Sequence, residues 1–186
     1  MMKEYRHIIC VWVIIFFAAM ITGPGLAAAD SARKINRESE AALKKLFSES
    51  PAAAELAKTA KAILVFPGMG KAGFIVGGQY GEGALFKQGN VAGYYNSVSL
   101  SYGLQAGIQK YSYVLFFMTD SALAYLDKSG GWEIGVGPSI VVVDKGAATG
   151  LSTTTAKADI YAFFFGQKGL MAGLGLQGTK ITRIDK

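Results

Sequence analysis

The stretch that decides the fold is Ser97-Val-Ser-Leu-Ser-Tyr-Gly-Leu-Gln-Ala-Gly-Ile-Gln109. Its apolar residues fall on one parity, and its Ser, Gly and Gln residues fall on the other. Side chains alternate between two faces along a strand, whereas a helix would scatter these residues around its circumference. The stretch therefore predicts one long, curved strand of an antiparallel sheet. Its second face is small and uncharged, so we expect either close packing against that face or a bend at Gly103 and Gly107.

Apolar runs on both sides of this stretch predict further strands. The run Ala62–Phe66 is uninterrupted and ended by Pro67-Gly68, which is typical of a buried strand. The segment Lys71–Phe86 mixes glycine with apolar residues and predicts a hairpin or a bent strand, with glycines where the sheet curls or packs closely. Lys110-Tyr111-Ser112 predicts a turn. The other predicted strands are 113–118, a strand from Trp132 that carries Ile134, Val136, Ile140 and Val142 on one parity, 160–165 and 179–184.

Helices are predicted before the first buried strand and once within the β-rich part. Residues 30–47 place apolar side chains on one stripe and many basic ones on the remainder. Ser50 as N-cap and Pro51 at the first position start a second helix. Thr119 or Asp120 caps a short third helix. The fold class is α+β: a curved, largely antiparallel β-sheet or partial barrel with two N-terminal helices and one short internal helix.

The N-terminal residues have the pattern of a secretory signal. A basic start is followed by the uncharged apolar run Ile8–Ile21, a Pro-Gly break and small residues up to Ala29. The run is shorter than the ~20 residues that span a bilayer. We therefore predict a signal peptide over residues 1–29 and one domain over residues 30–186, in an exported, periplasmic and membrane-associated protein. The alternative is an uncleaved membrane anchor.

Cleavage would remove much of the chain's reactive chemistry. Cys10 and His7 are the only thiol and imidazole, and both lie in the predicted signal. The remaining chain could not form a disulfide, a Cys/His zinc site, a Ser-His-Asp triad or a cysteine nucleophile. Five candidate carboxylates show no spacing that suggests catalysis: Glu82, Asp120, Glu133, Asp144 and Asp159. We expect no enzyme, no catalytic residue, no metal site and no cofactor.

One glycine motif matches a cofactor fingerprint by letter. Gly173–Gly178 fits the dinucleotide pattern, but a strand-like segment follows it where that fingerprint requires a helix. We therefore reject a dinucleotide site.

Eight short runs, each weak alone, form a specific ordered set. They are Ala60–Pro67, Lys71–Phe74, Gly77–Gly83, Gly103–Gly107, Phe116–Thr119, Gly131–Glu133, Lys168–Met171 and Gly178–Ile181. In this order the chain resembles the SYLF-domain family, and closely its exported bacterial members, over about residues 54–186. The resemblance implies binding rather than catalysis, since SYLF domains are associated with phospholipids, notably phosphoinositides. Eukaryotic members also bind actin and carry SH3 or FYVE modules; we expect neither here.

Basic residues are the candidates for lipid binding. Lys71, Lys110 and Lys168 lie at predicted turns or strand starts, and on a shared rim they could hold anionic headgroups. The alternative for each is a solvated turn lysine. Helix 30–47 also has two interpretations. It is either a surface helix packed on the sheet, or a basic helix that meets an anionic membrane through residues such as Arg33, Lys34 and Arg37.

Net charge is compatible with an anionic partner. The formal charge is +6, and loss of Lys3, Arg6 and Glu4 leaves 17 basic and 12 acidic residues, a net charge of +5. The basic residues are spread along the chain, so we expect no nucleic acid partner. We predict a non-catalytic phospholipid- or membrane-associated binding protein of the bacterial cell envelope. The alternative is a structural or interaction protein that binds an envelope protein rather than lipid.

Overall fold

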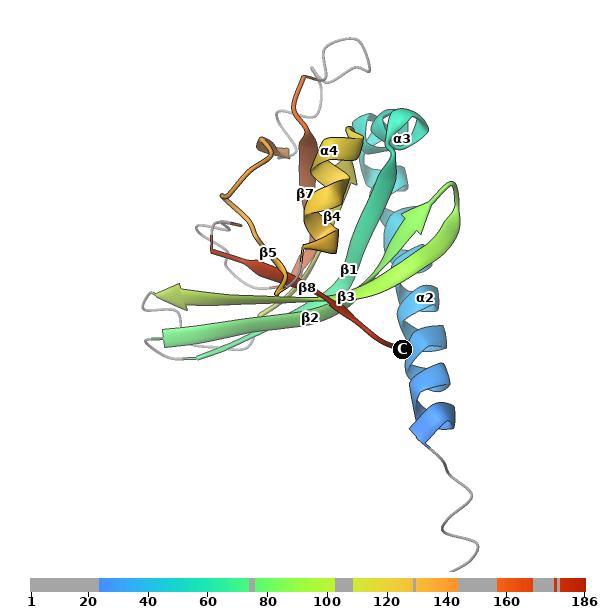
Figure 1. The fold of residues 1–186 in the computed structure, drawn as a ribbon, viewed down its shortest axis with the longest axis vertical. Coiled ribbons are helices and arrows are strands. Elements are labelled where there is room, and N and C mark those ends of the chain that lie inside the picture. Colours follow the sequence, from blue (N-terminus) through green and yellow to red (C-terminus); the bar gives the residue numbers. More distant parts are fainter. Residues whose placement is uncertain are drawn as a thin grey trace, which may run out of the picture. The chain divides into compact units, whose positions relative to one another are not determined.

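The computed structural model describes residues 24–73, 76–102, 109–128, 130–143, 157–168, 176 and 178–186 (Figure 1). The chain divides into residues 1–34 with 186, and residues 35–185, which hold the sheet. The helices are α2 (Pro24–Glu49), α3 (Pro51–Thr59), α4 (Asp120–Leu123) and the 3-10 turn η1 (Ala124–Asp127). The strands are β1 (Ala62–Gly73), β2 (Val76–Lys87), β3 (Asn90–Tyr102), β4 (Gln109–Phe117), β5 (Trp132–Glu133), β6 (Ile140–Val143), β7 (Ile160–Lys168) and β8 (Lys180–Ile184).

The eight described strands form one curled, open sheet. Their order is β5-β8-β3-β2-β1-β4-β7-β6. All neighbours are antiparallel except β6 and β7, which are parallel. The predicted α+β class, with a curved and largely antiparallel sheet, two N-terminal helices and a short internal helix, is therefore confirmed.

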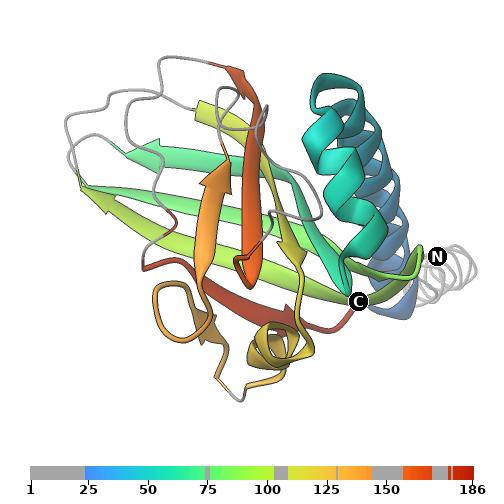
Figure 2. The same ribbon diagram turned by 90° about the horizontal axis from the view of Figure 1, so that it is seen from above.

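The sheet is covered on both faces by separate hydrophobic clusters. On the outer face, α3 and the part of α2 from Ile35 onward pack against β1, β4 and β7 (Figure 2). On the inner face, α4, η1 and Trp132 pack against the same strands. Apolar runs such as Leu64-Val65-Phe66 are buried on both sides, which is why they do not alternate in sequence.

Both predicted helix caps are confirmed. The Ser50 hydroxyl accepts a hydrogen bond from the backbone N–H of Ala53 at 3.3 Å. Thr119, one of the two candidates for the third helix, accepts from the N–H of Ala122 at 3.2 Å.

Close approach between β1 and β2 depends on glycine. A Cβ atom on Gly83 would lie 2.8 Å from the Phe66 ring and closer still to the Val65 carbonyl oxygen. One on Gly81 would lie 2.9 Å from the carbonyl oxygen of Gly68. The prediction that glycines mark close packing is confirmed at these two positions.

The predicted end of the first strand at Pro67-Gly68 is wrong, because β1 continues to Gly73. The pairing of β1 shifts register between Val65 and Gly70 on one side, and between Phe66 and Met69 on the other. Proline cannot donate to the ladder, and the strand accommodates it in a bulge.

The predicted single strand over residues 97–109 is also wrong. Residues up to Tyr102 belong to β3, and Gln109 begins β4, which pairs with β1 rather than with β3. Residues 103–108, with both glycines of the expected bend, lie outside the described residues. Lys110-Tyr111-Ser112 is not a turn, because these residues lie within β4.

The strand predicted to continue from Trp132 through Val142 is interrupted. Only Trp132–Glu133 and Ile140–Val143 are strands, and a turn separates them. Gly135 and Gly137 have φ angles of 108° and 100°, a region that is strained for other residues. The Trp132 indole N–H closes the turn by donating to the Val136 carbonyl at 3.0 Å.

Candidate functional site

The three candidate lysines lie on three neighbouring strands. Lys110, the second residue of β4, is the direct backbone partner of Lys168, the last residue of β7. Lys71 lies inside β1, not at a turn or strand start as expected, and pairs with Gln109 of β4. Backbone pairing thus brings all three to one end of the sheet, but only Lys110 and Lys168 share a face, because Lys71 pairs with the chain neighbour of Lys110.

Backbone pairing continues from Lys110 across the rest of the sheet. Direct partners share a face of a sheet, so the paired residues form one row on the outer face. We call this set the exposed row: Lys168, Lys110, Gly70, Tyr80, Val98, Lys180 and Glu133. All of its members except Lys168, whose side chain is not described, are exposed. Tyr80 and Val98 stand at its centre, with 51% and 42% of their surfaces exposed.

A carboxylate lies beside the centre of the exposed row. The Tyr80 hydroxyl donates a hydrogen bond to Oε1 of Glu82 at 2.8 Å. Desolvation, and then the bond to Glu82 and its negative charge, raise the pKa of Tyr80. The phenol therefore remains neutral at physiological pH.

The polar face of the opening stretch points inward. Ser97 is fully buried and Ser99 is nearly so, whereas Val98 is exposed. The Tyr113 hydroxyl donates to Oγ of Ser97 at 2.6 Å, and the buried Tyr111 hydroxyl donates to Oε1 of Gln79. The expectation that something packs against this polar face is confirmed at Ser97, where Tyr113 of β4 packs, while Tyr111 reaches Gln79, the β2 partner of Ser99.

These tyrosines belong to an aromatic stack inside the curl. The Tyr113 ring stacks on Phe66 with centroids 4.7 Å apart, and the centroid of the Phe164 ring lies 5.9 Å from that of Tyr111. Burial raises the pKa of Tyr111 to about 12 and raises that of Tyr113 still further. Both phenols are therefore neutral donors at ordinary pH.

The bond between Tyr113 and Ser97 gives a prediction about stability. Removing one partner leaves a buried polar group unsatisfied, so Tyr113→Phe and Ser97→Ala should each lower the free energy of unfolding by about 1–2 kcal/mol. The double variant should lose at least about 1 kcal/mol less than the sum of the two single losses. Urea unfolding of all four proteins measures this coupling. Additive losses would mean that the two hydroxyls do not depend on each other.

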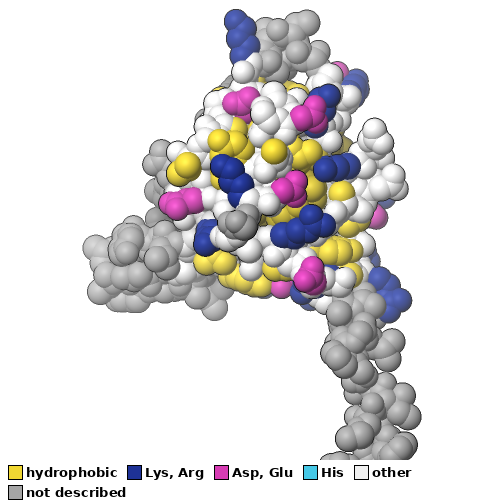
Figure 3. Space-filling model, viewed as in Figure 1, with side chains coloured by type: hydrophobic (Ala, Val, Ile, Leu, Met, Phe, Trp, Pro, Cys, Tyr) yellow, Lys and Arg dark blue, Asp and Glu magenta, His cyan; other side chains and the backbone are white. Residues whose placement is uncertain are grey.

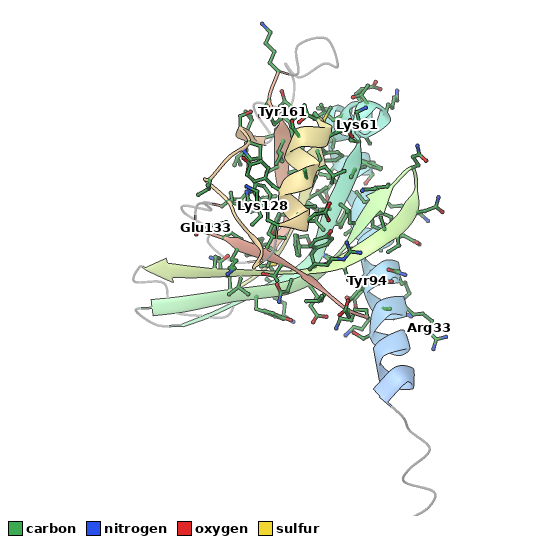
Figure 4. The ribbon with its side chains drawn as sticks, in the orientation of Figure 1. Arg33, Lys61, Tyr94, Lys128, Glu133 and Tyr161 are labelled. Carbon is green, nitrogen blue, oxygen red and sulfur yellow. The ribbon has the colours of Figure 1, made fainter. Side chains whose placement is uncertain are left out.

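The other candidate basic residues belong to the helix α2 rather than to the strands of the sheet. Arg33, Lys34 and Arg37 are exposed along this helix, where Figure 4 labels Arg33. From Ile35 onward, the apolar side of α2 is buried in the outer core through residues that include Ala42 and Leu46. The packed-surface-helix interpretation is therefore correct for that part. This apolar side could enter a membrane only by leaving the core.

Two of the candidate carboxylates, Asp159 and Asp120, have local polar partners. Asp159 accepts hydrogen bonds from the backbone N–H of Ser139 at 3.0 Å and its hydroxyl at 2.8 Å, and these bonds lower its pKa. Asp120 lies 3.6 Å from Lys61 in an exposed ion pair. Glu133 is the exposed backbone partner of Lys180. Asp144 lies outside the described residues.

Charges are mixed on the face of the molecule shown in Figure 3, where carboxylates lie among Lys and Arg side chains. On the inner side, Lys128 (labelled in Figure 4) lies over the Tyr125 ring, 3.4 Å from its centroid. Within the described ranges, no cluster of three or more His, Cys, Asp or Glu could hold a metal ion.

A comparison with known families finds a match for the C-terminal segment of the chain. Residues 98–186 match the Ysc84 family, described as Las17-binding protein actin regulator. The predicted SYLF resemblance is confirmed for this segment. The Ysc84 match covers β4, β7 and β8, whereas the quoted motifs between Ala60 and Gly83 lie before it. No curated protein matches the chain.

The Ysc84 description is one of binding and regulation, which supports a binding role for this segment. Among the described residues, every helix is too short or too polar to cross a membrane. The position of the Ysc84 match also shows that Lys110, Lys168, Val98 and Lys180 of the exposed row all lie within the family segment.

Proposed function

We propose that this chain is a non-catalytic protein of the bacterial cell envelope that binds phospholipid or a membrane surface. The observation that carries the proposal is the direct backbone pairing of Lys110 with Lys168, which places these two lysines on one face of the sheet, whereas Lys71 belongs to the other face. Such a group of lysines attracts anionic lipid headgroups, each contributing about 1 kcal/mol near a membrane surface. The signal-like N-terminus supports export to the periplasm, where the protein would be membrane-associated.

A protein partner is the second candidate function. The Ysc84 description names binding of another protein, Las17, as well as actin regulation. For an exported bacterial chain the corresponding role would be structural, through an envelope protein. Phosphoinositide-like headgroups are the ligands that the SYLF resemblance suggests, and other anionic lipids offer the same phosphate chemistry.

Co-sedimentation with vesicles tests the proposal. The chain is expressed with its full N-terminal sequence, purified after export, and mixed with phosphatidylcholine vesicles that contain increasing phosphatidylglycerol. We expect binding that increases with anionic content. It should weaken when salt rises from about 0.1 M to about 1 M, which shortens the Debye length from about 10 Å to about 3 Å.

A charge reversal locates the contact. Lys110→Glu should weaken binding to anionic vesicles about tenfold or more, because it removes a favourable charge and adds a repulsive one. Lys87→Glu makes the same change in net charge at the exposed end of β2, and should weaken binding less than about threefold. Equal effects would show that only net charge matters. Absence of any vesicle binding would refute the lipid function and favour a protein partner.

A further inference from the structure

We propose that the exposed row is the docking surface for an anionic bilayer, with Tyr80 and Val98 entering the interfacial zone and the flanking lysines contacting phosphates. The inference rests on the proposed function and names the surface and the mode of binding. Two exposed apolar side chains stand at the centre of the row. Tyr80 and Val98 are direct partners on β2 and β3, so they form one continuous apolar patch.

Lysines flank this apolar patch on both sides. Lys180 of β8 is the partner of Val98, and on the other side Gly70 separates Tyr80 from Lys110. Lys110 and Lys180 are four strands apart, or about 19 Å along the sheet. Gly70 has no side chain to shield the patch. The arrangement is therefore apolar and aromatic in the centre and cationic at its flanks.

The chemistry of the row suits a bilayer interface. Tyrosine is favoured there because its ring is apolar while its hydroxyl remains hydrated. Lysine stems can lie along apolar material while their ammonium groups reach phosphates. The carboxylate in the row itself, Glu133, lies at the β5 edge, beyond Lys180. Charge complementarity therefore favours an anionic lipid surface over a neutral one.

Two other features point to the row as the place of contact. The apolar side of α2 from Ile35 onward is already buried in the outer core. On the inner face, Ser99 of the opening stretch and its β2 partner Gln79 are also buried. Two carboxylates oppose contact: Glu82 beside Tyr80, and Glu133 at the β5 end of the row beside Lys180.

A tryptophan reporter tests insertion directly. Tyr80→Trp places an indole at the centre of the row; the background from the buried Trp132, and from Trp12 if the predicted signal is retained, is measured on the wild-type chain and subtracted. With phosphatidylglycerol–phosphatidylcholine vesicles that carry brominated acyl chains, we expect quenching and a blue shift of the added fluorescence. The matched control is Val141→Trp on β6, where the native side chain is also exposed, at 43%. Its fluorescence should not change.

Truncation of the apolar patch tests its contribution to affinity. Tyr80→Ser with Val98→Ser should weaken vesicle binding about tenfold or more, since exposed apolar area is what insertion buries. The control is Val141→Ser with Val142→Ser, which removes two exposed apolar side chains from β6 and should leave binding unchanged. Glu82→Gln should strengthen binding a few-fold, because one repulsive charge is lost.

The outcomes separate this inference from the function on which it rests. If the wild-type chain binds anionic vesicles but the Tyr80/Val98 double variant binds equally well, the docking surface is wrong and the lipid function stands. Equal quenching of the Tyr80→Trp and Val141→Trp variants would also overturn it. If the wild-type chain binds no vesicles, both proposals fail, and binding of Tyr80 and Val98 to a protein becomes the alternative.

Discussion

Replacement of Gly83 by alanine is expected to lower the free energy of unfolding by at least about 3 kcal/mol, at the upper end of what overpacking costs. The added methyl group would overlap the Val65 carbonyl and lie 2.8 Å from the Phe66 ring. These are atoms of the strand that pairs with β2 and are fully buried, so the sheet can relieve the overlap only by separating β1 from β2. Urea unfolding followed by circular dichroism measures the loss.

The same substitution at Gly78 is the control. Gly78 also lies in β2, and an added Cβ would meet no described atom within 4 Å. Gly78→Ala should therefore change stability by no more than about 1 kcal/mol, in either direction, and reduced freedom of the unfolded chain could stabilise it slightly. A loss at Gly83 as small as that at Gly78 would contradict the view that glycine sets the close packing of β1 on β2.

The elements of this fold could largely be predicted from local sequence, because their signals are local. The caps at Ser50 and Thr119 depend on residues within one turn, and both are present. Apolar runs such as residues 113–118 identify buried strands by composition alone. The errors occur where contacts between residues distant in sequence determine the structure. At Pro67, β1 continues past a bulge because it pairs with β2 on one side and with β4 on the other.

The alternation of residues 97–109 does not predict which of the two faces of the strand is buried. Alternation defines two faces but does not say which one the core covers. We expected the apolar parity to be one face and the serine parity the other, and the structure buries Ser97 while it exposes Val98. The deciding group is the hydroxyl of Tyr113, which bonds Ser97 from β4, a strand that is not a neighbour of β3.

The candidate site also depends on contacts between strands that local sequence does not reveal. Sequence reasoning identified Lys110 and Lys168 as separate basic residues, but their direct pairing depends on the register between β4 and β7. Tyr80 and Val98 were missed as site residues because an exposed apolar residue in a strand looks like a core residue. The alternation around Val98 did contain a signal. Serine side chains can form hydrogen bonds with buried hydroxyl groups, so the serine face could have been predicted as the buried one and Val98 as exposed.

Trp132 is the second position at which we expect a large loss of stability. Trp132→Ala should lower the free energy of unfolding by about 3–5 kcal/mol. The indole is 2% exposed and lies beside the Phe117 and Tyr125 rings, with centroids 6.1 and 6.3 Å away. It also donates to the Val136 carbonyl. One side chain therefore joins β4, η1 and the turn that ends β5.

The aromatic packing and the hydrogen bond of Trp132 can be measured separately. Trp132→Phe keeps most of the ring contacts but loses the bond to Val136, so its loss should be nearer about 1–2 kcal/mol, part of it from that bond. Far-ultraviolet circular dichroism follows unfolding, because both variants remove the indole signal. If Trp132→Ala costs less than about 1 kcal/mol, the surrounding side chains collapse into the space. That result would mean that the turn keeps its position against the inner core without the Trp132 indole.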